Sequence, residues 1–158
     1  MRFPEIPKLV ASVILCQIAG FLGSLFTIPA IPTWYATLKK PFFTPPNWVF
    51  SPVWISLFIL MGISLFFIWR RQGHPQFKKA LIFFFVQLIL NVLWSLAFFG
   101  LRLPLLGFID IILLWIAILL TILHFLKVSK FAGVLLIPYL LCVGFATLLN
   151  LSLWILNL

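Results

Sequence analysis

Residues 34–61 read WYATLKKPFFTPPNWVFSPVWISLFILM, a proline-rich polar segment that continues into an apolar, aromatic run. The prolines fix φ and reduce the conformational freedom of the polar half, and the aromatic residues supply large rigid surfaces. Two interpretations follow. Trp and Tyr settle at headgroup depth in many membrane proteins, forming an interfacial belt. Alternatively, residues 34–46 form an ordered lid that closes a cavity between helices, with Lys39 and Lys40 at its mouth.

The rest of the chain continues this apolar character. Of its 158 residues 65% are hydrophobic and 8% are charged, whereas soluble domains carry about 25% charged residues. We therefore expect a single integral membrane domain over residues 1–158, with the lipid bilayer as its surroundings. The formal net charge of +9 comes from basic residues placed singly or in pairs between apolar runs, which is typical of membrane flanks. A nucleic-acid partner is excluded on this ground.

Five segments are long and apolar enough to cross a bilayer core of about 30 Å as helices. We expect the first to end at Pro29 and Pro32, and short connections to make sequential helices antiparallel neighbours. Its apolar run passes the length of a signal peptide without an A-x-A site, so we expect it to be retained. The predicted fold is all-α, a bundle of five transmembrane helices with an ordered loop between the first two. The predicted spans are 8–28, 47–69, 79–100, 105–126 and 130–157.

The distribution of Lys and Arg predicts the orientation of the chain. With five spans, eight basic residues share a face with the N-terminus and three lie on the other face. The positive-inside rule then places the N-terminus in the cytoplasm and the C-terminus outside, and we expect a multi-pass protein of a bacterial membrane. The eight are Arg2, Lys8, Arg70, Arg71, Lys78, Lys79, Lys127 and Lys130, and the three are Lys39, Lys40 and Arg102.

Three helical faces combine aromatic and polar residues. Amide side chains are costly in hydrocarbon, so the polar members should point into the bundle. They either hold helices together by hydrogen bonds or line a largely apolar ligand cavity. The faces are Trp54, Phe58, Met61 and Leu65; Gln87, Asn91, Trp94 and Phe98; and Tyr139, Cys142, Ala146 and Asn150.

Other unusual residues receive structural interpretations. Ala19 and Gly23 allow close helix approach, either inside the bundle or at a dimer seam. Asp110 is expected to pair with Arg102 or to act as a helix-start carboxylate, and His124 to lie near the inner interface. Cys16, like Cys142, is expected to be a small buried hydrophobe. There is no Ser/His/Asp arrangement, carboxylate pair, metal-ligand cluster or glycine-rich phosphate loop in the sequence, so we expect no enzyme activity, no metal and no required cofactor.

Three blocks of sequence carry a resemblance to a known family. The first is W-Y-x-x-L-x-K-P, followed by P-P-x-W-x-F-x-P-V-W and L-x-x-M-G, within residues 34–62. The second spans Gln87 to Phe99, and the third includes Pro138-Tyr139-Leu140 and Leu149-Asn150. Together they resemble the TspO/MBR family, which comprises the translocator protein (peripheral-type benzodiazepine receptor) and tryptophan-rich sensory proteins.

The resemblance implies a binder of tetrapyrroles such as protoporphyrin IX, of sterols and of synthetic aromatic ligands, commonly as a homodimer. It implies a sensing, regulatory or transport role; the alternative is a protein that degrades porphyrins or translocates porphyrins or sterols. Lys39 and Lys40 are candidates to meet ligand carboxylates. The ligand-contacting candidates are Trp34, Tyr35, Trp54, Phe58, Gln87, Asn91, Trp94, Cys142, Ala146 and Asn150.

Two departures from the family pattern matter. Cys142 stands where the family usually has the Trp of P-Y-L-x-W, a residue implied in light-dependent porphyrin degradation, so we expect little of that activity. No Lys or Arg follows Tyr139, so the family's cholesterol-recognition pattern is incomplete. Transport would favour repeated halves with broken helices, and no such repeat is evident.

Overall fold

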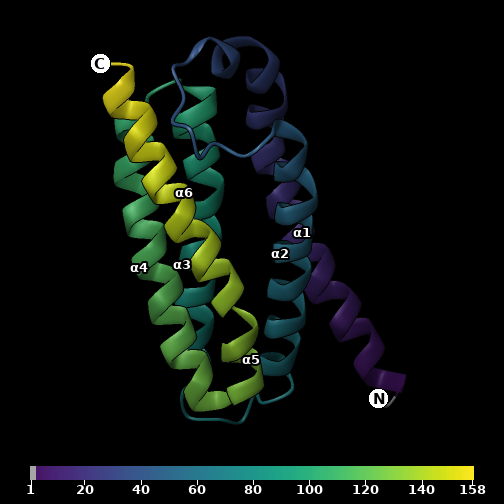
Figure 1. Ribbon diagram of the computed structural model, residues 1–158. Helices are drawn as coiled ribbons and strands as arrows, with labels where there is room; N and C mark the ends of the chain where they lie inside the picture. The colour runs from purple at the N-terminus through teal and green to yellow at the C-terminus, as the bar shows by residue number, and fades with distance from the viewer. Residues whose placement is uncertain (1–2) are drawn as a thin grey trace.

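The computed structural model describes residues 3–158 and confirms an all-helical fold (Figure 1). Five helical stretches of the described chain are long and apolar enough to cross a membrane. A short 3₁₀ turn at Phe3–Glu5 precedes α1. The main helices are α1 (Ile6–Ala30), α2 (Asn47–Trp69), α3 (Phe77–Ser95), α4 (Pro104–Val128), α5 (Lys130–Leu135) and α6 (Ile137–Leu156). Two π-helical segments extend α1 and α3, η2 (Ile31–Tyr35) and η3 (Leu96–Gly100).

The predicted end of the first span at Pro29 is wrong. Pro29 lies inside α1, and the chain stays helical through η2 to Tyr35. A proline inside a helix leaves carbonyl groups without their N–H partner, and in membranes hydroxyl side chains and π-type adjustments satisfy them. Pro29 lacks the N–H that would bond the Leu25 carbonyl, and the chain nevertheless continues past it into the wider π-helical turn of η2. As a result, Trp34 and Tyr35 end a helix instead of beginning a loop.

The last span, predicted as continuous over 130–157, is interrupted at Leu136. A turn at this residue separates α5 from α6, and the Leu136 N–H donates to the Gly133 carbonyl. Pro138 follows within the first turn of α6, where its missing N–H costs nothing. The break lets α5 lie against α2 while α6 packs along α4.

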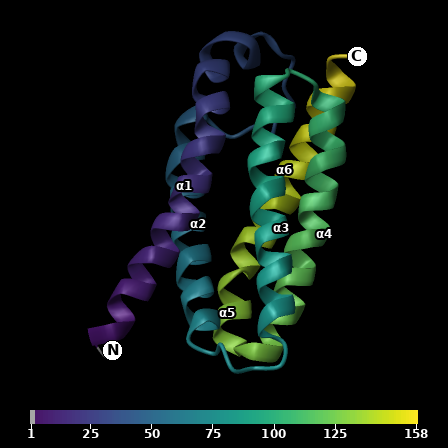
Figure 2. The same cartoon turned by 180° about the vertical axis from the view of Figure 1, so that it is seen from behind.

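The order of helices around the bundle differs from simple succession. α1 packs against both α2 and α3, α4 packs against α3 and α6, and α5 connects to α2. The short link between α2 and α3 predicted direct neighbours, and side chains of the two helices do meet: Trp54 stacks on Trp94, and Gln87 Nε2 donates to Met61 Sδ at 3.8 Å. In addition, α1 packs closely on both helices. Figures 1 and 2 show α2 and α6 flanking one side of the bundle, with the 36–46 loop crossing at one end.

Small residues permit the close contact of α1 with its neighbours. A Cβ placed on Gly62 of α2 would lie 2.5 Å from the Cα of Val13. On α1, a Cβ at Gly23 would lie 3.0 Å from Ser95 Oγ, and Ala19 is buried. Gly23 therefore serves packing inside the bundle, one of the two roles that its spacing predicted.

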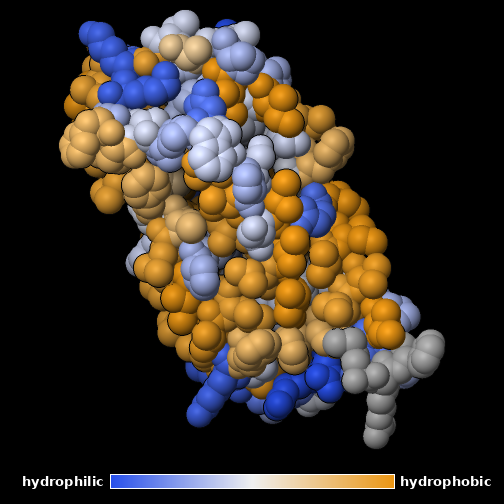
Figure 3. All heavy atoms as spheres, turned by 45° about the vertical axis from the view of Figure 1, so that its right-hand side comes forward, coloured by the Kyte–Doolittle hydropathy of each residue, from blue (hydrophilic) through white to orange (hydrophobic). Residues whose placement is uncertain are grey.

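The surface divides into an apolar middle and two polar ends (Figure 3). The N-terminus, the α2–α3 connection and the α4–α5 junction lie at one end, and the C-terminus and the 36–46 loop at the other (Figure 1). Arg70 Nε pairs with Glu5 Oε1 at 2.9 Å at the first end. Arg2, counted above for that end, lies outside the described residues. Which end faces the cytoplasm stays a prediction.

Candidate functional site

The 36–46 loop is held against α6 by a single amide side chain. Asn157 Oδ1 accepts a hydrogen bond from the Lys39 backbone N–H, and Asn157 Nδ2 donates to the Lys39 carbonyl, both at 2.9 Å. A second attachment joins Phe43 of the loop to Phe145 of α6, whose ring centroids are 6.0 Å apart. The loop is thus ordered and crosses the end of the bundle, as its proline content predicted.

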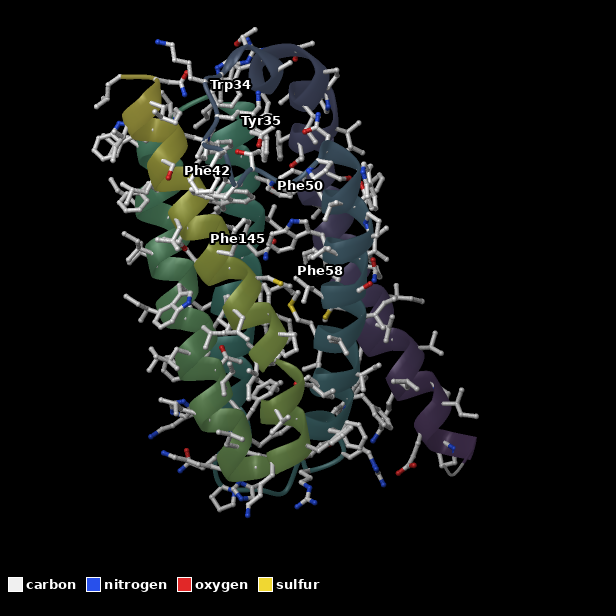
Figure 4. All side chains as sticks on the ribbon, viewed as in Figure 1. Trp34, Tyr35, Phe42, Phe50, Phe58 and Phe145 are labelled. Atoms are coloured by element: carbon white, nitrogen blue, oxygen red, sulfur yellow. The ribbon has the colours of Figure 1, made fainter. Side chains whose placement is uncertain are left out.

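Beneath this loop lies a cavity of about 360 Å³, which we call the α2–α6 cavity. Its volume falls in the range of small-molecule sites, about 300–1,000 Å³. Figure 4 shows Tyr35 at the loop end, with Phe50 on α2 and Phe145 on α6. The lining residues are Tyr35, Pro45, Val49, Phe50, Val53, Trp54, Trp94, Phe98, Phe99, Leu141, Cys142, Phe145, Ala146, Leu149, Asn150 and Leu153.

A second cavity of about 340 Å³ lies between α1, α2 and α3, and we call it the α1–α3 cavity. Its lining includes Gln17, Ser24 and Thr27 of α1, so it is more polar than the first. The same four aromatic residues line both cavities and form a wall between them. The members of this aromatic wall are Phe50, Trp54, Trp94 and Phe99.

Stacked rings stabilise the aromatic wall. The Trp54 and Trp94 ring centroids are 6.4 Å apart with an interplanar angle of 26°. Trp94 also stacks on Phe98 at 5.6 Å and meets the edge of Phe99 at 5.7 Å. Offset and edge-to-face pairs of this kind contribute beyond their buried area, so the wall is a packed element of the bundle.

The buried amides of α3 form interhelical hydrogen bonds. Asn91 Nδ2 donates to Tyr139 Oη at 2.7 Å, and Tyr139 Oη donates to Gln87 Oε1 at 2.9 Å. Trp94 Nε1 donates to Asn150 Oδ1 at 3.0 Å, and Asn150 Nδ2 donates to the Pro104 carbonyl at 2.9 Å. These bonds link α3 to α6 and α6 to the start of α4. The predicted role in holding helices together is thus confirmed. Asn91 and Asn150 also line cavities, and their contact with a ligand stays a prediction.

Eight of the twelve predicted site residues line a cavity, and they form three groups. Trp54 and Trp94 line both cavities; Phe58 and Asn91 line the α1–α3 cavity; and Tyr35, Cys142, Ala146 and Asn150 line the α2–α6 cavity. The remaining four candidates, Trp34, Lys39, Lys40 and Gln87, line neither cavity among the described residues.

Those four candidates have identifiable contacts of their own. Gln87 is bound within the Tyr139 network. Trp34 packs edge-on against Phe98 at 5.5 Å. Lys39 is exposed, and the Lys40 ammonium lies 4.7 Å from the centroid of the Tyr35 ring. Trp34 thus packs on Phe98, a lining residue of the α2–α6 cavity. Trp48, which is 74% exposed, is placed as a belt residue would be.

Sequence reasoning missed three contributors to the site. Phe50 and Phe99 lie within the quoted motifs but were not singled out. For Phe99 the reason is the π-helical turn after Ser95, which changes which residues of that helix face inward. No sequence pattern predicted the role of Asn157, because its hydrogen-bond partner Lys39 is 118 positions away.

Both predicted roles of Asp110 are wrong. Within residues 3–158 no salt bridge joins it to Arg102, and it lies beyond the first turn of α4. Its Oδ2 atom is buried without a hydrogen-bond partner in the described chain. His124 stacks on Phe83 at 4.5 Å, and its Nδ1 lies 2.8 Å from the Leu120 carbonyl oxygen.

Comparison with known proteins identifies relatives along nearly the whole chain. The sequence profile of the TspO/MBR family matches residues 12–155. The chain is 49% identical over 153 residues to the tryptophan-rich protein TspO of Archaeoglobus fulgidus, covering 97% of this chain and 99% of the relative. It is 44% identical to TspO of Chlorobaculum tepidum, with 97% and 98% covered. It is 34% identical to the translocator protein of Bos taurus, with 98% and 92% covered.

Proposed function

Because the chain belongs to the TspO/MBR family, we propose that it binds porphyrins such as protoporphyrin IX in the α2–α6 cavity. The family match confirms the resemblance noted in the sequence, and with five apolar helices it makes the chain a multi-pass integral membrane protein. Relatives are named as sensory and translocator proteins. We extend a sensing or transport role to this chain, along with sterols or synthetic aromatic compounds as further ligands and a homodimeric state.

The observation that carries the proposal is the composition of the α2–α6 cavity. Its lining is almost entirely aromatic and aliphatic, with few polar atoms. Flat macrocycles gain from stacking against tryptophan and phenylalanine rings and from leaving water or lipid. The loop across its end supplies Lys39 and Lys40, which favour a ligand with carboxylates. The predicted cytoplasmic N-terminus would place this loop outside.

A titration in detergent tests this function. Protoporphyrin IX is expected to quench the tryptophan fluorescence of the purified protein saturably, because Trp54 and Trp94 line the cavity. A porphyrin Soret shift should saturate at the same concentration. Quenching that rises linearly without saturation, as partitioning into the micelle would give, would contradict the proposal.

Porphyrin degradation is the second candidate activity, and Cys142 is the observation that bears on it. Cys142 lines the α2–α6 cavity and is half-buried, so a Trp there would face the ligand. We expect the protein to bind porphyrin without rapid photobleaching. The Cys142→Trp variant should accelerate light-dependent loss of the Soret band, measured against Cys142→Phe as a non-indole control. If porphyrin bound to the unmodified protein bleached far faster than free porphyrin, Cys142 would not limit the reaction.

The two hydrogen bonds between the Asn157 side chain and the Lys39 backbone lead to a prediction for the rate of ligand dissociation. Asn157→Ala removes both hydrogen bonds to the Lys39 backbone, each worth about 0.5–1.5 kcal/mol. The loop should then open more often, and porphyrin dissociation measured by stopped flow should become about tenfold faster. Ser152→Ala is the matched control, since the Ser152 hydroxyl bonds only within α6, to Leu148. An unchanged dissociation rate in Asn157→Ala would mean that the loop does not gate the cavity.

A further inference from the structure

Tyr35 lines the α2–α6 cavity and carries a buried polar atom without a partner among the described residues. Tyr35 is 2% exposed, and its Oη forms no hydrogen bond with any described residue. Its ring is fixed between Phe50 and Phe99, with centroid distances of 6.5 and 5.8 Å. A buried hydroxyl without a partner loses its hydration and gains nothing in return. Such a group is expected where a ligand completes the hydrogen bond.

Two other polar side chains that line this cavity, Trp94 and Asn150, are already engaged. Trp94 Nε1 donates to Asn150 Oδ1, and the Asn150 amide nitrogen donates to the Pro104 carbonyl. Tyr139 provides the direct comparison, because its equally buried Oη donates to Gln87 and accepts from Asn91. Tyr35 therefore differs from Tyr139 in its partners, not in its burial.

The charge near Tyr35 indicates what kind of acceptor would bind there. The Lys40 ammonium lies 4.7 Å from the centroid of the Tyr35 ring and donates to the Leu38 carbonyl. The two acidic residues of the chain, Glu5 and Asp110, line neither cavity. A hydroxyl donor on a ring that a lysine ammonium covers, with no carboxylate in the cavity lining, favours an anionic oxygen.

We propose that Tyr35 Oη donates a hydrogen bond to a carboxylate of the ligand and so orients a flat, apolar acid with its acidic edge toward the 36–46 loop. This inference rests on the proposed porphyrin-binding function and goes further, since it names the atom that selects acids over uncharged macrocycles. Figure 4 shows Tyr35 at the loop end of the bundle, where the acidic edge would lie.

Tyr35→Phe tests the inference, because it removes one oxygen and keeps the ring. Two porphyrins are titrated: protoporphyrin IX, which has two propionic acids, and etioporphyrin I, which carries only alkyl groups. The affinity of Tyr35→Phe for protoporphyrin IX should fall about tenfold or more, as expected for a hydrogen bond to a charged group. Its affinity for etioporphyrin should stay within about twofold of the unmodified protein.

The melting temperature of the ligand-free protein gives an independent readout. Tyr35→Phe should melt at the same temperature or higher, because a hydroxyl without a partner is removed. Tyr139→Phe, the matched variant, should melt lower because it breaks two hydrogen bonds. A drop in Tyr35→Phe equal to that in Tyr139→Phe would reveal a partner inside the folded protein and overturn the inference.

The binding results separate this inference from the proposed function. If the unmodified protein binds both porphyrins equally tightly, or if Tyr35→Phe weakens both equally, the function stands and the role of Tyr35 is overturned. If the unmodified protein binds neither porphyrin, both proposals are overturned. Selective loss of protoporphyrin IX affinity supports both.

Discussion

Replacing Trp54 by alanine is expected to weaken protoporphyrin IX binding by roughly thirtyfold, since truncation of a well-buried aromatic in a binding interface commonly costs about 2 kcal/mol or more. Trp54 lines both cavities, and its ring contacts Trp94, Phe58 and Tyr139. Its loss removes a stacking surface for the ligand and opens the aromatic wall toward the α1–α3 cavity. A Soret-band titration measures the change without depending on tryptophan fluorescence.

Trp115→Ala is the matched control for this effect. Trp115 is half-buried on α4, packs near Gly144 and lines neither cavity in the described structure. Its truncation should lower the melting temperature of the ligand-free protein and leave porphyrin affinity within about twofold. Equal losses of affinity in the two variants would show that binding tracks general packing and not the cavity wall.

Gly62→Ala is expected to produce the largest loss of stability of any single methyl addition considered. The added Cβ would lie 2.5 Å from Val13 Cα and 3.0 Å from Val13 N. Because these are backbone atoms, relief requires that α1 move away from α2 along its length. Overpacking of a tight core costs about 1–3 kcal/mol, occasionally more, and here it also disturbs the packing of α1 on α3.

Thermal unfolding in detergent, followed by circular dichroism, measures this loss. Gly73→Ala serves as the control, because nothing lies within 4 Å of a Cβ at that position in the α2–α3 connection. Gly73→Ala should melt at the temperature of the unmodified protein or slightly above it, through reduced freedom of the unfolded chain. Comparable melting of Gly62→Ala and the unmodified protein would mean that α1 and α2 tolerate a wider separation than the structure indicates.

The sequence alone determined the class of the fold and the family. Hydropathy over about 20 residues is a local property, because each membrane-spanning helix must satisfy its own backbone hydrogen bonds. The motif around Trp34 and Trp54 could also be identified from the sequence alone, since it depends on residue identity and spacing. It also pointed to Tyr35, Trp54 and Phe58, which line the cavities, although their ligand remains a proposal.

Tertiary structure alone decided features that depend on contacts between distant segments. Whether Pro29 ends a helix depends on whether the helix can continue without the Pro29 N–H, here into a π-helical turn, which composition does not show. The packing of α1 on α3 as well as on α2 likewise joins segments that are distant in the sequence. The sequence does not distinguish a buried hydroxyl that is hydrogen-bonded from one that is not. Only the folded structure shows that Tyr139 Oη has hydrogen-bond partners whereas Tyr35 Oη has none among the described residues. The contact between Asn157 and Lys39 also depends on the tertiary structure, because a hydrogen bond across 118 residues exists only once the chain has folded.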